Sequence, residues 1–335
     1  MHRTGNSRSG IHRPRGALIS HVGERCGVYQ YGRRLYKALK KTNFINWSFV
    51  ECENPDSLQK AISELQPSIL VFNYHPSTLG WVTRKTFDGT NTCNFAIVHE
   101  VNSGVADAVE YSIFDFCLCP DPTLSNTHSR ILSIPRFIPK FKETIREPEV
   151  FTVGSFGFAT PGKGFEKLCS LVDRQFKHAK IKLLIPKHDS EEMVSELERS
   201  SIINACQNAV DQQHVLLEIL DEFLSESDLL RFLAGNTINA FAYEGDGAER
   251  GLSSCIDYAL AARRPIAVSS SAMFRHILAE CPEVSLEKNS LQAIARLGTR
   301  PLERLRREYS PTHAGEEINQ TIVKAAAGFL GRKIS

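Results

Sequence analysis

The sequence contains no uninterrupted apolar stretch that approaches the ~20 residues a membrane-spanning helix needs. Its 335 residues are 42% hydrophobic and 23% charged, a composition typical of soluble globular proteins. A chain of this length is too long for one ordinary core and is expected to form two domains. These features argue against a helical membrane protein and favour a two-domain globular one.

Motifs for a disulfide framework or a metal site are also missing. The nine cysteines are scattered, odd in number and without a Cys-x-x-Cys pair, which favours reduced thiols in a cytosol. Cys117 and Cys119 alternate within an apolar segment and are expected to pack inside a strand. No Asp-x-Asp pair or His/Cys cluster has the spacing of a metal site. We therefore expect no bound metal ion.

The net charge of +2 is unevenly distributed along the chain. Residues 1–145 hold 17 Lys and Arg against 12 Asp and Glu, and the remainder hold 23 against 26. Part of the excess lies in residues 1–15, which lack the apolar core of a secretory signal and are expected to form a disordered basic arm. Solvated helix faces explain such charge best, but it could also attract an anionic membrane or an acidic acceptor. We expect a cytoplasmic protein, with peripheral contact at the inner membrane face as a further option.

The most informative stretch runs from Tyr243 to Pro265 and reads YEGDGAERGLSSCIDYALAARRP. An apolar run at 238–242 predicts a strand before it. The later apolar positions recur at helical spacing and are Leu252, Cys255, Ile256 and Ala259. The pattern therefore predicts a strand, a loop and a helix that starts near Arg250. The free amides and positive dipole end of such a helix suit a phosphate group.

Two acids, Glu249 and Asp257, bracket this turn. If the intervening residues were helical, the acids would lie ~12 Å apart along the axis. A nucleotide sugar presents sugar hydroxyls, a diphosphate and ribose hydroxyls in the same order. The alternative interpretation is a strand, a surface loop and an amphipathic helix that carries two solvated acids.

The segment Glu249-x7-Asp257, followed by a small-residue helix and a strand led by Pro265, resembles the E-x7-E signature of GT-B glycosyltransferases of the retaining, glycosyltransferase-4-like type. The second acid is Asp in place of Glu. The resemblance implies an α/β fold of two Rossmann-like, doubly wound parallel-sheet domains that face each other across a cleft. It also implies that Glu249 holds the donor-sugar hydroxyls and Asp257 the ribose. The backbone positions assigned to the donor diphosphate are Arg250, Gly251 and Leu252.

The first half of the chain shows alternating strand and helix patterns, which predict a parallel sheet with ligands outside the carboxyl ends of its strands. A glycine turn at 22–29 leads into its first helix, without the G-x-G-x-x-G spacing of a dinucleotide site. This turn resembles the family's opening loop, so Gly27 is expected near the donor phosphates, or else to be a structural turn. His99 resembles the strand-end histidine that faces the donor sugar, so the resemblance implies that His99 and Glu249 are the catalytic residues, with His99 at the reacting centre. The alternative for His99 is a residue that caps a loop. His75, at another strand end, is expected to cap a loop.

In the second half, a strand at 151–157 is followed by Pro161-Gly-Lys-Gly-Phe165 and a helix. A lysine at such a helix start lies where a phosphate binds. The segment is very similar to the family's strand-turn-helix, in which the residue matching Lys163 grips the donor diphosphate. An arginine usually shares this task a few residues earlier, but Phe158 and its neighbours stand there instead. The alternative for Lys163 is a surface lysine after a glycine turn.

These patterns together predict an acceptor-side domain at 16–145, a nucleotide-sugar domain at 146–310 and a C-terminal helix at 311–335 that returns to the first domain. We expect an enzyme that transfers a sugar from a nucleotide-sugar donor to a hydroxyl of a carbohydrate or lipid-linked glycan, with retention. The donor is a substrate, and no cofactor or nucleic-acid partner is expected. A non-catalytic binding protein for carbohydrates or nucleotide sugars and a nucleotide-sugar 2-epimerase remain the alternatives.

Overall fold

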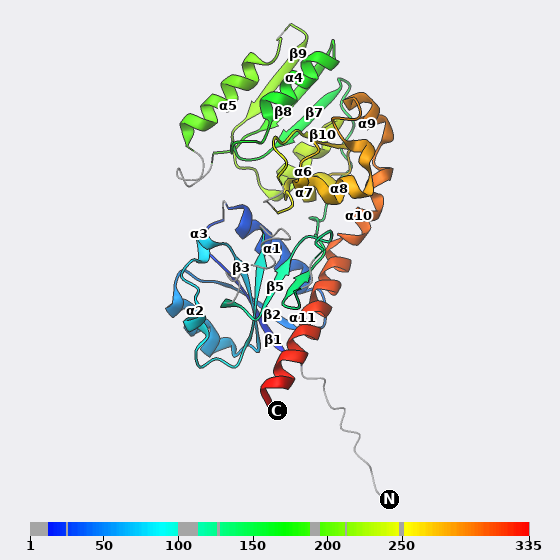
Figure 1. The fold of residues 1–335 in the computed structure, drawn as a ribbon. Coiled ribbons are helices and arrows are strands. Elements are labelled where there is room, and N and C mark those ends of the chain that lie inside the picture. The colour runs from blue at the N-terminus through cyan, green and yellow to red at the C-terminus, as the bar shows by residue number, and fades with distance from the viewer. Residues whose placement is uncertain are drawn as a thin grey trace, which may run out of the picture.

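The computed structural model of the chain describes residues 13–24, 26–99, 113–125, 128–187, 195–211, 213–247 and 251–334. They form two α/β domains stacked end to end, each built on its own sheet, with a long C-terminal helix running beside the first domain (Figure 1). All strand pairs in both sheets are parallel. The predicted architecture of two Rossmann-like parallel-sheet domains is confirmed.

The first sheet has the strand order β2-β1-β3-β4-β5-β6. Its central strands are buried on both faces, which explains why they read as continuous apolar runs. The strands are β1 (Arg15–Ser20), β2 (Asn46–Glu51), β3 (Ile69–Tyr74), β4 (Cys93–Val98), β5 (Phe116–Cys119) and β6 (Ile131–Ser133). The helices are α1 (Gly27–Leu39), α2 (Pro55–Leu65) and α3 (Pro76–Leu79). Asn54 and Ser57 form a capping box that fixes the start of α2.

The second sheet has the strand order β11-β10-β7-β8-β9. Its strands are β7 (Thr152–Phe156), β8 (Ala179–Leu184), β9 (Val215–Leu220), β10 (Ile238–Phe241) and β11 (Ile266–Val268). Its helices are α4 (Phe165–Gln175), α5 (Glu196–Asn208), α6 (Glu226–Ala234), α7 (Cys255–Ala261), α8 (Arg275–Glu280), α9 (Leu291–Leu297) and α10 (Glu303–Glu308). The order places β7 and β10 at the centre, so the loops after these two strands open at the same edge of the sheet.

The helix α11 (Pro311–Ile334) leaves the second domain and packs along α1 of the first (Figure 1). Its apolar residues Ala314, Ile318 and Ile322 are buried in the core of the first domain. At Gly315 the two helices approach so closely that a Cβ would lie 2.8 Å from the carbonyl oxygen of Ala38. No helix within the described residues is long and apolar enough to cross a membrane.

The predicted helix start near Arg250 is wrong, because α7 begins only at Cys255. The backbone amide of Ser253 donates to the carbonyl oxygen of Met273, 3.1 Å away. This bond joins Ser253 to the loop after β11. In a helix that began near Arg250, the amide of Ser253 would instead have bonded to a carbonyl oxygen four residues earlier. Asp257 therefore lies in the first turn of α7 and not two turns into a helix.

We predict that Asn319→Ala lowers the stability of the first domain. Asn319 is fully buried, its Oδ1 accepts from Trp47 Nε1 at 2.8 Å, and its Nδ2 donates to Thr42 Oγ1 and to the carbonyl oxygen of Leu39. Removing the amide leaves the buried indole N–H of Trp47 without its acceptor, at a cost of about 1–3 kcal/mol. Urea unfolding followed by tryptophan fluorescence measures the loss. The matched control Asn208→Ala, at an exposed position on α5, should stay within about 0.5 kcal/mol of the parent, and an equal midpoint for both variants would contradict the account.

Candidate functional site

Two neighbouring cavities lie between the domains, at the carboxyl ends of the central strands. The larger, about 530 Å³, is lined mainly by the second domain, and the smaller, about 230 Å³, by both domains. Both are lined by Gly27 at the start of α1, by Lys163 and by Ser254. The shared lining residues show that the two cavities are adjoining parts of one interdomain cleft.

Lys163 lies in the turn between β7 and α4, and its Nζ donates to Tyr243 Oη at 2.7 Å. The turn is held close to β10: a Cβ at Gly164, whose φ is 63°, would lie only 2.0 Å from the carbonyl oxygen of Ala242. Only glycine fits such a position without distortion. The ammonium group is therefore fixed where it lines both cavities.

Tyr243 connects Lys163 to the loop that precedes α7. Its hydroxyl lies 3.0 Å from Ser253 Oγ and donates to Cys255 Sγ. Burial, with a further contribution from Cys255, raises the pKa of Tyr243 well above its ordinary value, so the phenol stays protonated. A neutral phenol can accept a hydrogen bond from the Lys163 ammonium group and donate its own hydrogen to Cys255 Sγ.

His99 follows β4, and its Nε2 lies 3.0 Å from Asn73 Oδ1. Because Asn73 Nδ2 donates to the carbonyl oxygen of Val28, its Oδ1 must accept from His99, and Nε2 must carry the hydrogen. Burial, and then the charge of Arg136, lowers the pKa of His99 to about 3. The ring is therefore neutral at physiological pH, and Nδ1 is an acceptor. It suits a donor such as a sugar hydroxyl and cannot act as a general acid near neutral pH.

The other predicted residues of the first domain also line the cleft. No atom lies within 4 Å of a Cβ built at Gly27, so this position is open toward the cavities. His75 lines the smaller cavity, and its Nδ1 also accepts the Ser77 amide as the cap of α3. Gly251 and Leu252 line the same cavity from the second domain.

Asp257 does not line either cavity. It is fully buried, and its two carboxylate oxygens accept from Arg136, with 3.0 Å between Arg136 Nε and Oδ1 and 2.5 Å between Nη2 and Oδ2. Arg136 itself lines the smaller cavity and also donates to the carbonyl oxygen of Pro120. Asp257 therefore holds Arg136 in its position at the cleft. Its predicted contact with a ribose stays a prediction.

Glu249 and Arg250 lie outside the described residues. Sequence reasoning missed three residues that line the cleft, Tyr31, Phe223 and Tyr258. It also missed the two contacts that hold the cations of the cleft, Arg136 with Asp257 and Lys163 with Tyr243. Nothing local marks them, because each meets the cleft through a contact distant in sequence. Within the described residues, no group of three or more His, Cys, Asp or Glu could hold a metal ion.

Aromatic rings form part of the lining of the larger cavity. Phe158, which occupies the neighbourhood of the expected phosphate arginine, stacks against Phe223 with 6.4 Å between ring centroids and 24° between planes. Ser225, which caps α6 by accepting the Asp228 amide, lines the same cavity. The cavity thus offers flat apolar surfaces together with polar groups, a combination typical of sites for small planar rings.

Two facing Rossmann-like domains with a cleft at their strand ends define the GT-B fold, and comparison with solved structures confirms it. Anabaena HepE, solved with UDP and glucose, has a TM-score of 0.65 and 9% identity, over 93% of this chain and 100% of that one. The trehalose-phosphate synthase of Burkholderia xenovorans has a TM-score of 0.65 and 10% identity, over 92% and 100%. AviGT4, a glycosyltransferase involved in avilamycin A biosynthesis, has a TM-score of 0.60 and 12% identity, over 94% of this chain and 98% of that one. No protein-family model and no curated protein matches the sequence. At these identities the likeness establishes the fold alone.

We predict that His99 stays neutral throughout the range from pH 5 to 8, with hydrogen on Nε2. Nitrogen-detected NMR of the imidazole groups reports both properties, and His99→Gln assigns the signals. Because the folded pKa of about 3 lies below the ordinary 6.5, the histidine favours folding most above pH 6.5, and this contribution falls as the pH drops toward 3. A titration midpoint near 6.5, or hydrogen on Nδ1, would contradict this assignment.

Proposed function

We propose that the protein is a glycosyltransferase that moves a sugar from a nucleotide-sugar donor to an acceptor hydroxyl. The observation that carries this proposal is Lys163, fixed on the second domain where it lines both cavities opposite Gly27 and near Arg136. One cationic group between a ring-sized apolar cavity and a small polar one fits the diphosphate of a nucleotide sugar. Solved GT-B neighbours support this proposal, because HepE was solved with UDP or UDP-glucose, an alpha-glucosyltransferase was solved with UDP-glucose, and AviGT4 is named as a glycosyltransferase.

Three regions of the cleft would hold the three parts of the donor. The nucleoside would lie in the larger cavity, against Phe158 and Phe223, with the diphosphate at Lys163 and the backbone of Gly251 and Leu252. The sugar would enter the smaller cavity, where His99 Nδ1 accepts from one of its hydroxyls. UDP is the first nucleotide to test, because solved structures of the neighbour HepE contain it.

In the proposed reaction, these residues stabilise the charges that separate as the sugar leaves the diphosphate. Glycosyl transfer passes through an oxocarbenium-like state while negative charge builds on the departing diphosphate. Lys163 and Arg136 would stabilise that charge, and neither has to rearrange, since Tyr243 and Asp257 already hold them. Glu249, outside the described residues, is retained as the proposed ligand of the sugar hydroxyls. Retention of configuration and independence from metal belong to the same proposal, as do a carbohydrate or lipid-linked acceptor and a cytoplasmic location.

Two observations favour the non-catalytic alternative, a protein that binds nucleotide sugars without transferring them. The phosphate arginine of the resembling family is replaced by an aromatic residue, Phe158, and the carboxylate of Asp257 is bound to Arg136. Donor hydrolysis separates the two cases, because a transferase slowly transfers its sugar to water and a binding protein does not. Nothing in the described geometry favours the epimerase alternative.

We predict that Lys163→Ala weakens UDP binding about ten- to hundredfold. Loss of a charge-assisted hydrogen bond costs about 1.5–3 kcal/mol, and each 1.4 kcal/mol is a factor of about ten in affinity. Calorimetric titration of UDP measures the change. The matched control is Lys167→Ala, which removes the same charge from an exposed position of α4 outside both cavities. Equal UDP affinity in the parent and Lys163→Ala would remove the phosphate assignment.

A further inference from the structure

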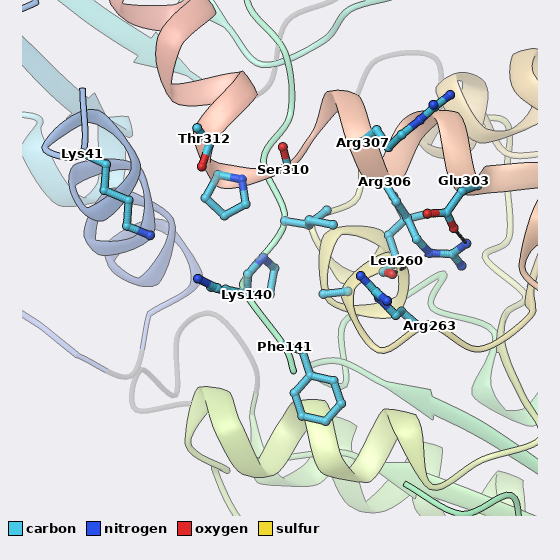
Figure 2. Close-up of a pocket in the computed structure, with 14 residues that line it drawn as sticks. Lys41, Lys140, Phe141, Leu260, Arg263, Glu303, Arg306, Arg307, Ser310 and Thr312 are labelled. Atoms are coloured by element: carbon cyan, nitrogen blue, oxygen red, sulfur yellow. Dashed lines mark hydrogen bonds and ion pairs between the residues drawn. The ribbon is translucent and has the colours of Figure 1, made fainter. Parts of the chain in front are cut away.

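A third cavity, of about 370 Å³, lies where the chain crosses between the domains (Figure 2). The two crossing segments are tied there by the amide of Ile138, which donates to the carbonyl oxygen of Tyr309 at 2.8 Å. Lys41, beyond the end of α1, contributes from the first domain, and Arg263, beyond the end of α7, from the second. The cavity is therefore separate from the cleft and spans both domains.

The lining of this cavity is strongly basic. Five cationic side chains face one carboxylate, that of Glu303, whose oxygen lies 3.3 Å from Arg306 Nη1. The cationic residues are Lys41, Lys140, Arg263, Arg306 and Arg307. Cations gathered in one concave site repel one another, and a low-dielectric wall strengthens the field that they create. An anion in the cavity would relieve this repulsion.

Arg306 gives the clearest sign that negative charge would be favourable at this cavity. Its side chain is 4% exposed, its Nε donates to the carbonyl oxygen of Leu260 and its Nη1 to that of Thr299. Its Nη2 is buried and has no hydrogen-bond partner among the described residues. Burial, together with the nearby charge of Arg263 and against the effect of Glu303, lowers the pKa of Arg306. A buried cation that leaves a donor without a partner is costly, and negative charge in the adjoining cavity would offset part of that cost.

The first turn of α11 adds uncharged donors to the same cavity. Ser310, Pro311 and Thr312 line it, and the turn contains no acidic residue. The positive end of the helix dipole lies there. Pro311 has no N–H and the amide of Ser310 donates to the carbonyl oxygen of Arg307, so the donors from this turn are the two hydroxyls and the amide of Thr312. Guanidinium groups, ammonium groups, hydroxyls and helix amides together are the donors that bind phosphate in proteins.

We propose that this cavity binds a soluble small molecule that carries one or more phosphate groups. The ligand would join Lys41 of the first domain to Arg263 and Arg307 of the second, beside the two segments that cross between them. It would therefore oppose separation of the domains on this side of the molecule. The proposal does not depend on glycosyl transfer, because none of these residues lines the cleft.

Inorganic pyrophosphate is the probe, titrated by calorimetry into the full chain carrying Lys163→Ala, so that the cleft lysine is removed from every arm. We expect measurable binding in this background and at least a tenfold loss when Arg263→Gln and Arg307→Gln are added. The matched control adds Lys167→Gln and Arg174→Gln, two exposed cations of α4, and should stay within about twofold.

Lys41→Gln with Arg307→Gln provides a second variant that leaves the backbone near Arg263 untouched, and it should lose affinity to a similar degree. Thermal unfolding of each variant checks that the fold is retained. The proposal is overturned if pyrophosphate does not bind the background protein, or if both cavity variants bind it as tightly as the control.

Discussion

The buried ion pair between Arg136 and Asp257 is the contact on which the rest of the cleft depends. It joins the segment after the first sheet to α7 of the second domain, across 121 residues of sequence, with both side chains almost fully buried. An isolated charge at either position would be costly, and breaking such a pair typically costs about 3–5 kcal/mol. The ion pair between Arg136 and Asp257 therefore opposes separation of the two domains.

Other contacts across the cleft follow from this arrangement. The guanidinium of Arg34, on α1, lies 4.4 Å from the ring centroid of Tyr258 and 5.6 Å from that of Phe137. Arg275 of the second domain forms an ion pair with Asp121 of the first. Arg136 and Arg275 are each paired with a carboxylate, and the charges of Arg136 and Arg34 both contribute to the low pKa of His99. The cleft thus combines fixed cations with a neutral histidine, which suits an anionic donor whose sugar must be recognised by hydrogen bonds.

The features that could be predicted from the sequence are those that depend on local residue patterns. The alternating strands and helices gave the two parallel sheets, and the glycine turn before α4 placed Lys163 at the carboxyl end of β7. The prediction was wrong for the start of α7, because the bond from Ser253 to Met273 is made between segments 20 residues apart. The pairing of Arg136 with Asp257 could not be predicted either. The sequence presented Asp257 as an expected ribose ligand and Arg136 as a charge in the segment between the domains, and only the stacking of the domains brings them together.

The most direct test of the account is consumption of a nucleotide sugar by the purified full chain. The protein is incubated with single UDP-, GDP-, ADP- and dTDP-sugars, and release of the nucleoside diphosphate is followed by phosphorus NMR. The account predicts that at least one donor is converted to nucleoside diphosphate and free or transferred sugar, and that Lys163→Ala slows this conversion. If a nucleotide sugar binds in the cleft but none is consumed, with or without candidate acceptor sugars, the protein is a binding protein and the transferase assignment is contradicted.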